Sequence, residues 1–163
     1  MHNLWYGLED RVFVVTGGSR GIGLEIAREL LNQKAKVVIC GRKQEGLDAA
    51  KESLQGGDSL LAVQAHVAKE EDVNRLFDAA LEKFGRIDVL VNNMGMNLPT
   101  GSLVDTETGM WQKIIDSNLT STFMCARRAG KVMQAQKSGR IVSVTSVAAH
   151  KASPGLNVYG IAK

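Results

Sequence analysis

Two side chains near the end of the sequence have the types and the spacing of an acid–base pair. Tyr159 precedes Lys163 by four residues in the stretch NVYGIAK (157–163). Residues four apart lie on the same face of an α-helix. A phenol in water loses its proton only near pH ~10, and a neighbouring ammonium group favours its ionisation. The lysine charge can therefore acidify the phenol, which makes the pair a candidate active site.

A glycine-rich stretch, TGGSRGIG (Thr16–Gly23), follows the first expected strand and opens the first expected helix. Glycines let a phosphate approach the backbone, and a helix N-terminus offers unpaired N–H groups and the positive end of its dipole. The spacing Gly-x-x-x-Gly-x-Gly differs from the usual Gly-x-Gly-x-x-Gly. Its place in the chain nevertheless predicts a dinucleotide diphosphate on this turn.

The residues after the second expected strand indicate which dinucleotide binds. An NAD site usually has Asp or Glu here, bound to the 2′-hydroxyl of the ribose. This sequence has Arg42 and Lys43 in CGRKQ, and no acid. A carboxylate would repel a 2′-phosphate, whereas guanidinium groups such as those of Arg42 and Arg20 can bind one. We therefore expect NADP(H), with NAD(H) less favoured; the alternative is that both arginines only extend into solvent.

Short β-rich segments alternate with longer segments of helical periodicity. Strands are expected at 11–17, 35–41, 59–67, 87–93 and 139–146, and helices at 23–33, 44–55, 70–85 and about 109–136. Strands separated by helices predict right-handed crossovers and a parallel sheet covered by helices on both faces. This is a doubly wound α/β fold, which binds ligands at the carboxyl ends of its strands. The reactive stretches all fall at such ends.

Together these motifs resemble the short-chain dehydrogenase/reductase superfamily over residues 8–163. The resemblance rests on the glycine turn, VNNMG (91–95), Asn118, Ser146 and Tyr159-x-x-x-Lys163 in the family's order and spacing. It implies a Rossmann-like three-layer sandwich and a single dinucleotide-binding domain over residues 1–163. The stretches CGRKQ and AHVAKEEDV are most similar to NADP-dependent carbonyl reductases that act on retinal-like and xenobiotic ketones.

The resemblance implies hydride transfer between NADP(H) and a ketone or secondary alcohol. Tyr159 would be the general acid in reduction and the general base in oxidation, and Lys163 would supply the charge and bind the nicotinamide ribose. Ser146 would hold the substrate carbonyl, and Asn118 would anchor a water that leads to Lys163. The expected cofactor-binding residues are Gly17, Ser19, Arg20, Gly21, Ile22, Gly23, Arg42, His66, Val67, Asn93, Gly95, Tyr159 and Lys163.

Three positions raise separate questions. Met94 stands where the family more often has alanine, and we expect it to narrow the floor under the adenine ribose. His66 stands where an aspartate usually faces the adenine amino group. A neutral imidazole could still accept that bond, or His66 could merely cap the strand. His150 lies between Ser146 and Tyr159, where it either contacts substrate or faces solvent.

The family continues beyond the lysine with the rest of the helix, two more strands and a substrate lid. The resemblance therefore implies that the domain is C-terminally incomplete, with its last strands missing. The side chains expected to lose their cover are Leu119, Phe123, Met124 and Met133. A terminal α-carboxylate would also partly cancel the charge of Lys163, so we expect a chain that ends there to be inactive.

Composition excludes several functional classes. The 163 residues are 44% hydrophobic and 23% charged, with a formal net charge of +3. Lysine and arginine are scattered, so no nucleic-acid surface is expected. No apolar run is long enough to span a membrane, and residues 1–11 do not have the pattern of a signal peptide. Cys40 and Cys125 show no metal-ligand spacing, and two free thiols without a metal favour the cytoplasm.

Three functions remain open. The first is an NADP(H)-dependent carbonyl reductase or alcohol dehydrogenase, acting on a small molecule and assembled as a homodimer or homotetramer. The second is an NAD-dependent hydroxyacyl or steroid-type dehydrogenase, which would leave Arg42 idle. The third is a catalytically silent nucleotide-binding subunit. Retention of all four catalytic positions favours the first.

Overall fold

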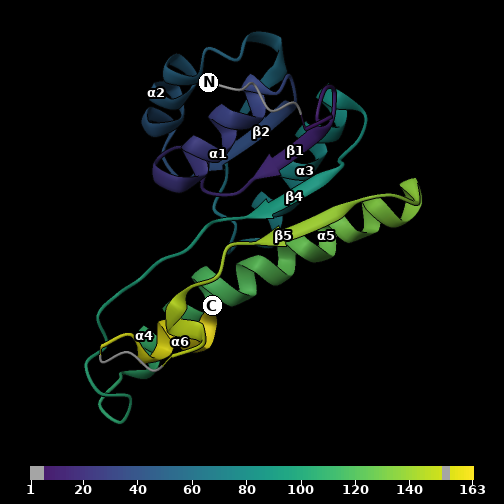
Figure 1. Ribbon diagram of the computed structural model, residues 1–163. Coiled ribbons are helices and arrows are strands. Elements are labelled where there is room, and N and C mark those ends of the chain that lie inside the picture. The colour runs from purple at the N-terminus through teal and green to yellow at the C-terminus, as the bar shows by residue number, and fades with distance from the viewer. Residues whose placement is uncertain (1–5, 152–154) are drawn as a thin grey trace.

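Five parallel strands form one sheet in the order β3-β2-β1-β4-β5 (Figure 1). The structure is a computed structural model that describes residues 6–151 and 155–163, so the start of the N-terminal stretch considered above lies outside the described residues. The strands are β1 (Val12–Val15), β2 (Lys36–Gly41), β3 (Leu60–Gln64), β4 (Val89–Asn92) and β5 (Arg140–Ser143). The predicted doubly wound parallel sheet is confirmed.

Helices cover both faces of this sheet. On one face lie α1 (Gly21–Asn32) and α2 (Gln44–Leu54), and on the other lie α3 (Glu70–Phe84) and α5 (Ser121–Gln136). Two short helices, α4 (Thr108–Ile115) and α6 (Asn157–Ala162), lie side by side beyond the carboxyl edge of the sheet. The 3₁₀ turns η1 (Gly57–Ser59) and η3 (Val147–Ala149) complete the elements. No helix among residues 6–151 and 155–163 is long and apolar enough to cross a bilayer.

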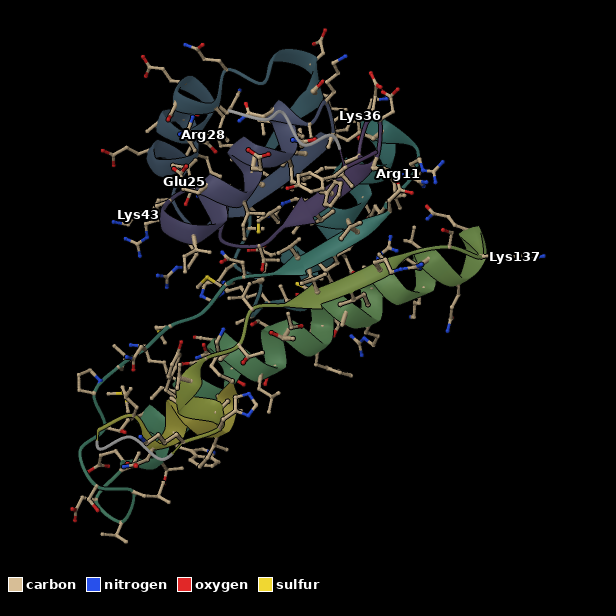
Figure 2. The ribbon with its side chains drawn as sticks, in the orientation of Figure 1. Arg11, Glu25, Arg28, Lys36, Lys43 and Lys137 are labelled. Atoms are coloured by element: carbon tan, nitrogen blue, oxygen red, sulfur yellow. The ribbon has the colours of Figure 1, made fainter. Side chains whose placement is uncertain are left out.

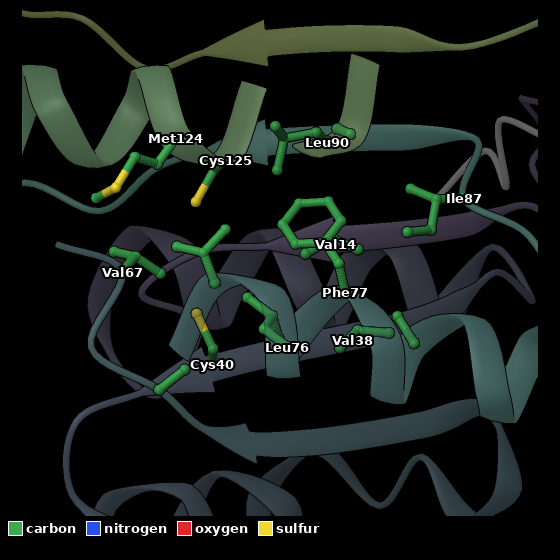
Figure 3. Packing of buried hydrophobic residues seen from close by; sticks show 14 of the residues in the cluster. Val14, Val38, Cys40, Val67, Leu76, Phe77, Ile87, Leu90, Met124 and Cys125 are labelled. Carbon is green, nitrogen blue, oxygen red and sulfur yellow. The ribbon is translucent and has the colours of Figure 1, made fainter. Parts of the chain in front are cut away.

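Alternation along β1 explains the two cores. Phe13 and Val15 pack with α1 and α2, whereas Val14 packs with α3 and α5. Successive side chains of a strand point to opposite faces, so a strand covered on both sides must be apolar throughout. Figure 3 shows the second core, in which Phe77 of α3 and Cys125 of α5 point into the space beside Val14.

The long helical region predicted at 109–136 is interrupted by one wider turn. The π-helical segment Asp116–Thr120 joins α4 to α5 and contains Asn118. Such turns shift the register of backbone hydrogen bonds and are frequent at functional sites. The hydroxyl of Thr122 donates to the Asn118 carbonyl oxygen at 2.6 Å, which satisfies that carbonyl within the segment.

The last strand is uncovered. All four residues of β5 are exposed, and Leu119 and Phe123 on the outer side of the α5 region are 49% and 56% exposed. The prediction for Met124 and Met133 was wrong, because both are buried. These two methionines lie on the side of α5 that faces the sheet, where α3 and β4 already cover them.

Candidate active site

The glycine turn brings the end of β1 close to the start of α1. Gly17 has a φ of +67°, which favours glycine at this position. A Cβ atom on Gly23 would collide with the Gly17 carbonyl oxygen and lie 2.5 Å from Asn93 Nδ2. Gly21 and Ile22, the first residues of α1, are exposed, so the N-terminus of the helix faces outward. The turn therefore leaves room for a phosphate where side chains would otherwise stand.

Thr16 and Asn93 lock the glycine turn to the end of β4. Thr16 Oγ1 accepts hydrogen bonds from the N–H groups of Asn93 at 3.1 Å and Met94 at 3.0 Å. In return, Asn93 Nδ2 donates to the carbonyl oxygens of Thr16 at 2.9 Å and Gly17 at 3.3 Å. Thr16 was missed as a site residue. The only signal for it is a hydroxyl at the carboxyl end of an otherwise apolar strand.

The end of β2 presents cationic side chains next to Gly41, which has no side chain. Ser19 Oγ lies against Gly41, where a Cβ atom would be only 2.9 Å from it. Arg20, Arg42 and Lys43 are exposed, and Lys43 projects away from the sheet (Figure 2). Within the described part of the chain, no side chain pairs with these three cations. The edge therefore carries uncompensated positive charge.

Lys163 and Asn118 meet on either side of Gly95. A Cβ atom on Gly95 would lie 3.1 Å from Lys163 Nζ and 3.3 Å from Asn118 Oδ1. Lys163 Nζ donates to the carbonyl oxygen of Val144, just beyond β5, at 2.7 Å. Burial lowers the pKa of Lys163, because desolvation disfavours its charged form. Residues separated widely in the chain thus converge at the carboxyl edge of β4 and β5.

The side-chain amide of Asn118 makes three hydrogen bonds to the backbone. Its Oδ1 accepts from the Met96 N–H at 3.0 Å, and its Nδ2 donates to the carbonyl oxygens of Met96 at 2.9 Å and Ile114 at 2.8 Å. Asn118 is 2% exposed. The buried amide therefore fixes the loop after β4 against the π-helical turn, a contact that residue propensity alone does not reveal.

Tyr159 and Ser146 come from two segments in close contact. A Cβ atom on Gly160 would lie 2.5 Å from the Ala148 carbonyl oxygen, so α6 and η3 touch through backbone. Ser146 caps η3 by accepting from the Ala148 N–H at 3.2 Å. Tyr159 is half-buried and packs against the small cluster of Ile114, Val158 and Ala162. His150 is exposed on the same loop.

His66 and Val67 lie beyond β3 rather than within it. The His66 N–H donates to Asp72 Oδ2 at 2.7 Å, and His66 Nδ1 accepts from the Ala68 N–H at 3.3 Å. The first of these bonds lowers the pKa of Asp72. The Val67 side chain is buried in the core beside Val73. The imidazole thus accepts a backbone hydrogen bond in the turn after β3.

Both cysteines are buried free thiols, and the Cys40 carbonyl oxygen accepts from the Gly18 N–H of the glycine turn at 3.1 Å. Burial raises the pKa of Cys40 to about 11 and that of Cys125 to about 12, so both remain thiols at neutral pH. Over the ranges that the structure describes, no three His, Cys, Asp or Glu side chains gather into a possible metal site. The side chains placed at the edge above carry hydroxyl, amide and cationic groups.

Comparison with known proteins shows which family the chain is similar to. The family model described as "short chain dehydrogenase" matches residues 11–163. A 3-oxoacyl-[acyl-carrier-protein] reductase from Synechocystis is 42% identical over 158 residues, which cover 96% of this chain and 64% of that protein. The human protein named dehydrogenase/reductase SDR family member 4 is 37% identical, with 96% of this chain and 56% of that protein covered.

Solved structures show the same fold. A short chain dehydrogenase from Bacillus anthracis superposes with a TM-score of 0.89 at 34% identity, covering 94% of this chain and 64% of that one. Levodione reductase superposes with a TM-score of 0.90 at 29% identity, covering 95% of this chain and 61% of that one. The chain therefore spans less than two thirds of the length of these relatives.

Proposed function

Because this chain belongs to the short-chain dehydrogenase family, we propose that it carries the cofactor site and the reacting side chains of an NADP(H)-dependent oxidoreductase. The reaction is hydride transfer between NADP(H) and a ketone or secondary alcohol. Residues 1–163 would belong to a single dinucleotide-binding domain. In the relatives this domain is longer, since the chain covers less than two thirds of their length. The observation that carries the proposal is the meeting of Lys163 and Asn118 at Gly95, beside the end of β5.

The glycine turn fits a dinucleotide diphosphate. We call the space over the turn, which the absence of a side chain at Gly23 keeps open, the cradle. The exposed start of α1 supplies N–H groups to it. The lock between Thr16 and Asn93 holds this cradle before any ligand arrives. When bound, NADPH supplies the hydride to the substrate carbonyl carbon.

The protein's own side chains manage the proton and the developing charge. Ser146 Oγ already accepts from the Ala148 N–H, so its own hydrogen is free to donate to a substrate carbonyl oxygen. Tyr159 donates the proton that this oxygen takes up as hydride arrives at carbon. Lys163 favours ionisation of the phenol through its charge, and the Val144 carbonyl holds the ammonium in place. In alcohol oxidation the same groups act in reverse.

Three features of the β2 edge support NADP(H) over NAD(H). Gly41, at the end of β2, offers no carboxylate for a free 2′-hydroxyl, the group that an NAD site usually has there. Arg20 and Arg42 are exposed and have no acidic partner among the described residues. A 2′-phosphate would satisfy both the Ser19 hydroxyl and the guanidinium groups.

The cofactor assignment is tested by Arg42→Asp. The variant should weaken NADPH binding about 10- to 100-fold and NADH binding far less, because a charged hydrogen bond to the 2′-phosphate is lost. Arg140→Asp makes the same charge change on exposed β5 and should leave both affinities near their original values. Equal weakening of NADPH and NADH by Arg42→Asp, measured by isothermal titration calorimetry, would contradict NADP(H) preference.

Catalysis is tested by Tyr159→Phe in the full native polypeptide. The phenol oxygen is removed and the ring is kept, so NADPH affinity should stay within about threefold while kcat falls at least about 100-fold. An unchanged kcat would point to a silent nucleotide-binding subunit. The substrates to test follow from the relatives' names: a 3-oxoacyl-[acyl-carrier-protein], as for the Synechocystis protein, and levodione, as for levodione reductase.

The exposed apolar side chains Leu119, Phe123 and Ile141 also support a homo-oligomer. Sedimentation velocity of the native polypeptide tests this: a monomer at micromolar concentration would contradict it. A cytoplasmic location remains part of the same proposal and rests on the two free thiols.

A further inference from the structure

The turn that follows β3 determines which nitrogen of His66 carries hydrogen. The Ala68 N–H donates to His66 Nδ1 at 3.3 Å, so Nδ1 must offer its lone pair. A neutral imidazole has one N–H and one acceptor nitrogen. Nε2 therefore carries the hydrogen, and the outward side of the ring is a donor and not an acceptor.

Two bonds of the His66 backbone hold the turn in place around the ring. The His66 N–H donates to Asp72 Oδ2 at 2.7 Å, and the Lys69 N–H donates to the His66 carbonyl oxygen at 2.7 Å. His66 is half-buried, and its Nε2 makes no hydrogen bond to any residue within 6–151 or 155–163. The free N–H is thus available to a ligand at the carboxyl edge of the sheet.

The path of a bound dinucleotide leads to this ring. With the diphosphate on the β1–α1 turn, the adenosine ribose reaches the end of β2, which neighbours β3. The Ala65 N–H donates to the Gly41 carbonyl oxygen at 3.0 Å, so the chain after β3 still runs beside the ribose end of β2. His66 is the next residue. The base attached to that ribose therefore lies against the segment that presents His66.

This placement has a consequence for base recognition. Adenine presents an amino donor at its six position, whereas hypoxanthine presents a carbonyl acceptor there. A donor on the protein cannot accept from the amino group but can donate to the carbonyl. Resting on the proposed NADP(H) site, we propose that His66 removes selection for the adenine amino group, so that the site binds the hypoxanthine dinucleotide as well as or better than NADPH.

Two substitutions at this position change whether the side chain offers a donor or an acceptor to the base, while both keep its bond in the turn. In His66→Asp, one carboxylate oxygen accepts from the Ala68 N–H and the other accepts from the adenine amino group. In His66→Asn, Oδ1 accepts from the Ala68 N–H and the amide NH₂ remains a donor, as in the imidazole. Both side chains can keep the turn, since each can accept the same backbone bond.

The experiment measures the affinities of NADPH and deamino-NADPH, its hypoxanthine analogue, by isothermal titration calorimetry on the native polypeptide. The original protein and His66→Asn should bind the two within about threefold of each other, or favour the analogue. His66→Asp should prefer NADPH at least about tenfold, as expected for a hydrogen bond to a charged group. His150→Asp places the same charge change on an exposed loop and should keep the original ratio.

Each outcome has a separate meaning. A tenfold or greater preference of the original protein for NADPH would overturn the role of His66 while leaving the NADP(H) site intact. An unchanged ratio in His66→Asp would do the same. Failure of the original protein to bind either dinucleotide would overturn the proposed cofactor site, and the base preference with it.

Discussion

The nucleotide region (residues 6–92) and the reactive region (residues 94–163) are stabilised in different ways. β1 is completely buried and β2 is buried along its centre, with helices packed on both faces. β5 is exposed along its whole length, and the helix that carries Tyr159 rests on a buried cluster of only Ile114, Val158 and Ala162. Figure 1 shows α4 and α6 extending beyond the sheet rather than covering it.

This difference shows which interactions hold each region in place. The glycine turn is held by a large shared core and by the reciprocal bonds of Thr16 and Asn93. Lys163 and Asn118 are held mainly by individual hydrogen bonds to backbone carbonyls and N–H groups. Changes in the reactive region should therefore affect catalysis more than they affect binding of the adenosine half of the cofactor. The following experiments test that contrast.

A large effect on cofactor binding is expected in the nucleotide region, from Gly23→Ala. The added methyl group would collide with the Gly17 carbonyl oxygen, so the cradle must open or α1 must move. At an overpacking cost of ~1–3 kcal/mol, NADPH affinity should fall about tenfold or more. Gly130→Ala is the control, because a Cβ there meets nothing within 4 Å in the interior of α5. Unchanged NADPH affinity in Gly23→Ala would show that the glycine turn does not hold the diphosphate.

Asp88 is the buried carboxylate that ties the start of β4 to β1. It is 4% exposed and accepts from the Val12 N–H at 2.9 Å and from Arg86 Nη2 at 2.6 Å. Asp88→Ala leaves the Val12 N–H without its partner, and should lower the free energy of unfolding by ~2–4 kcal/mol. Urea denaturation measures this loss. A loss of unfolding free energy below ~1 kcal/mol would show that the bonds of Asp88 contribute little to stability.

The same carboxylate gives the nucleotide region a pH dependence. Burial by itself raises the pKa of Asp88, but the hydrogen bonds from Arg86 and the Val12 N–H more than offset this, and the pKa lies below its ordinary value. Its stabilisation is present above the unfolded-state pKa of ~3.9 and is lost as pH falls through the lower folded-state value. Asp88→Asn should therefore flatten part of the decline in unfolding free energy below pH ~4. Identical acid profiles of the two proteins would contradict this.

Val91 and Val142 allow a direct comparison of the two regions by one chemical change. They are paired in register on neighbouring strands, but Val91 is 7% exposed and Val142 is 51% exposed. Val91→Ala should cost about 2 kcal/mol of unfolding free energy, and Val142→Ala less than about 1 kcal/mol. Equal costs in the native polypeptide would mean that a further segment or a second copy covers β5.

The smallest effect is expected from the charge of Lys163. Since burial lowers its pKa in the folded state, the unfolding free energy should rise with pH between that folded-state value and the unfolded value of ~10.4. Lys163→Met lacks this increment, which we expect to be under about 1 kcal/mol because the side chain is only half-buried. The two alkaline stability profiles, measured by denaturation between pH 8 and 11, should differ only in this slope. Parallel profiles would mean that burial does not perturb the ammonium group.

Local patterns alone predicted the elements and the edge at which the site forms. Apolar β-rich runs, helical periodicity and the glycine turn at Thr16–Gly23 depend on residues that are neighbours in sequence. They can therefore be identified from the sequence alone. Parallel strands then require their carboxyl ends to share one edge, which brings the glycine turn and the Ser146 segment to the same side. This part of the prediction followed from chain geometry and is confirmed by the sheet order.

Tertiary structure decided which face of each element is covered and which polar groups meet. Periodicity did not tell that Met124 and Met133 face the sheet while Phe123 faces outward, because packing alone selects the buried arc of α5. The bonds between Thr16 and Asn93 join residues 77 apart in sequence. The bonds between the Asn118 amide and Met96 join residues 22 apart. Hydrogen bonds are short and directional, so contacts of this kind exist only once the fold has brought the partners together.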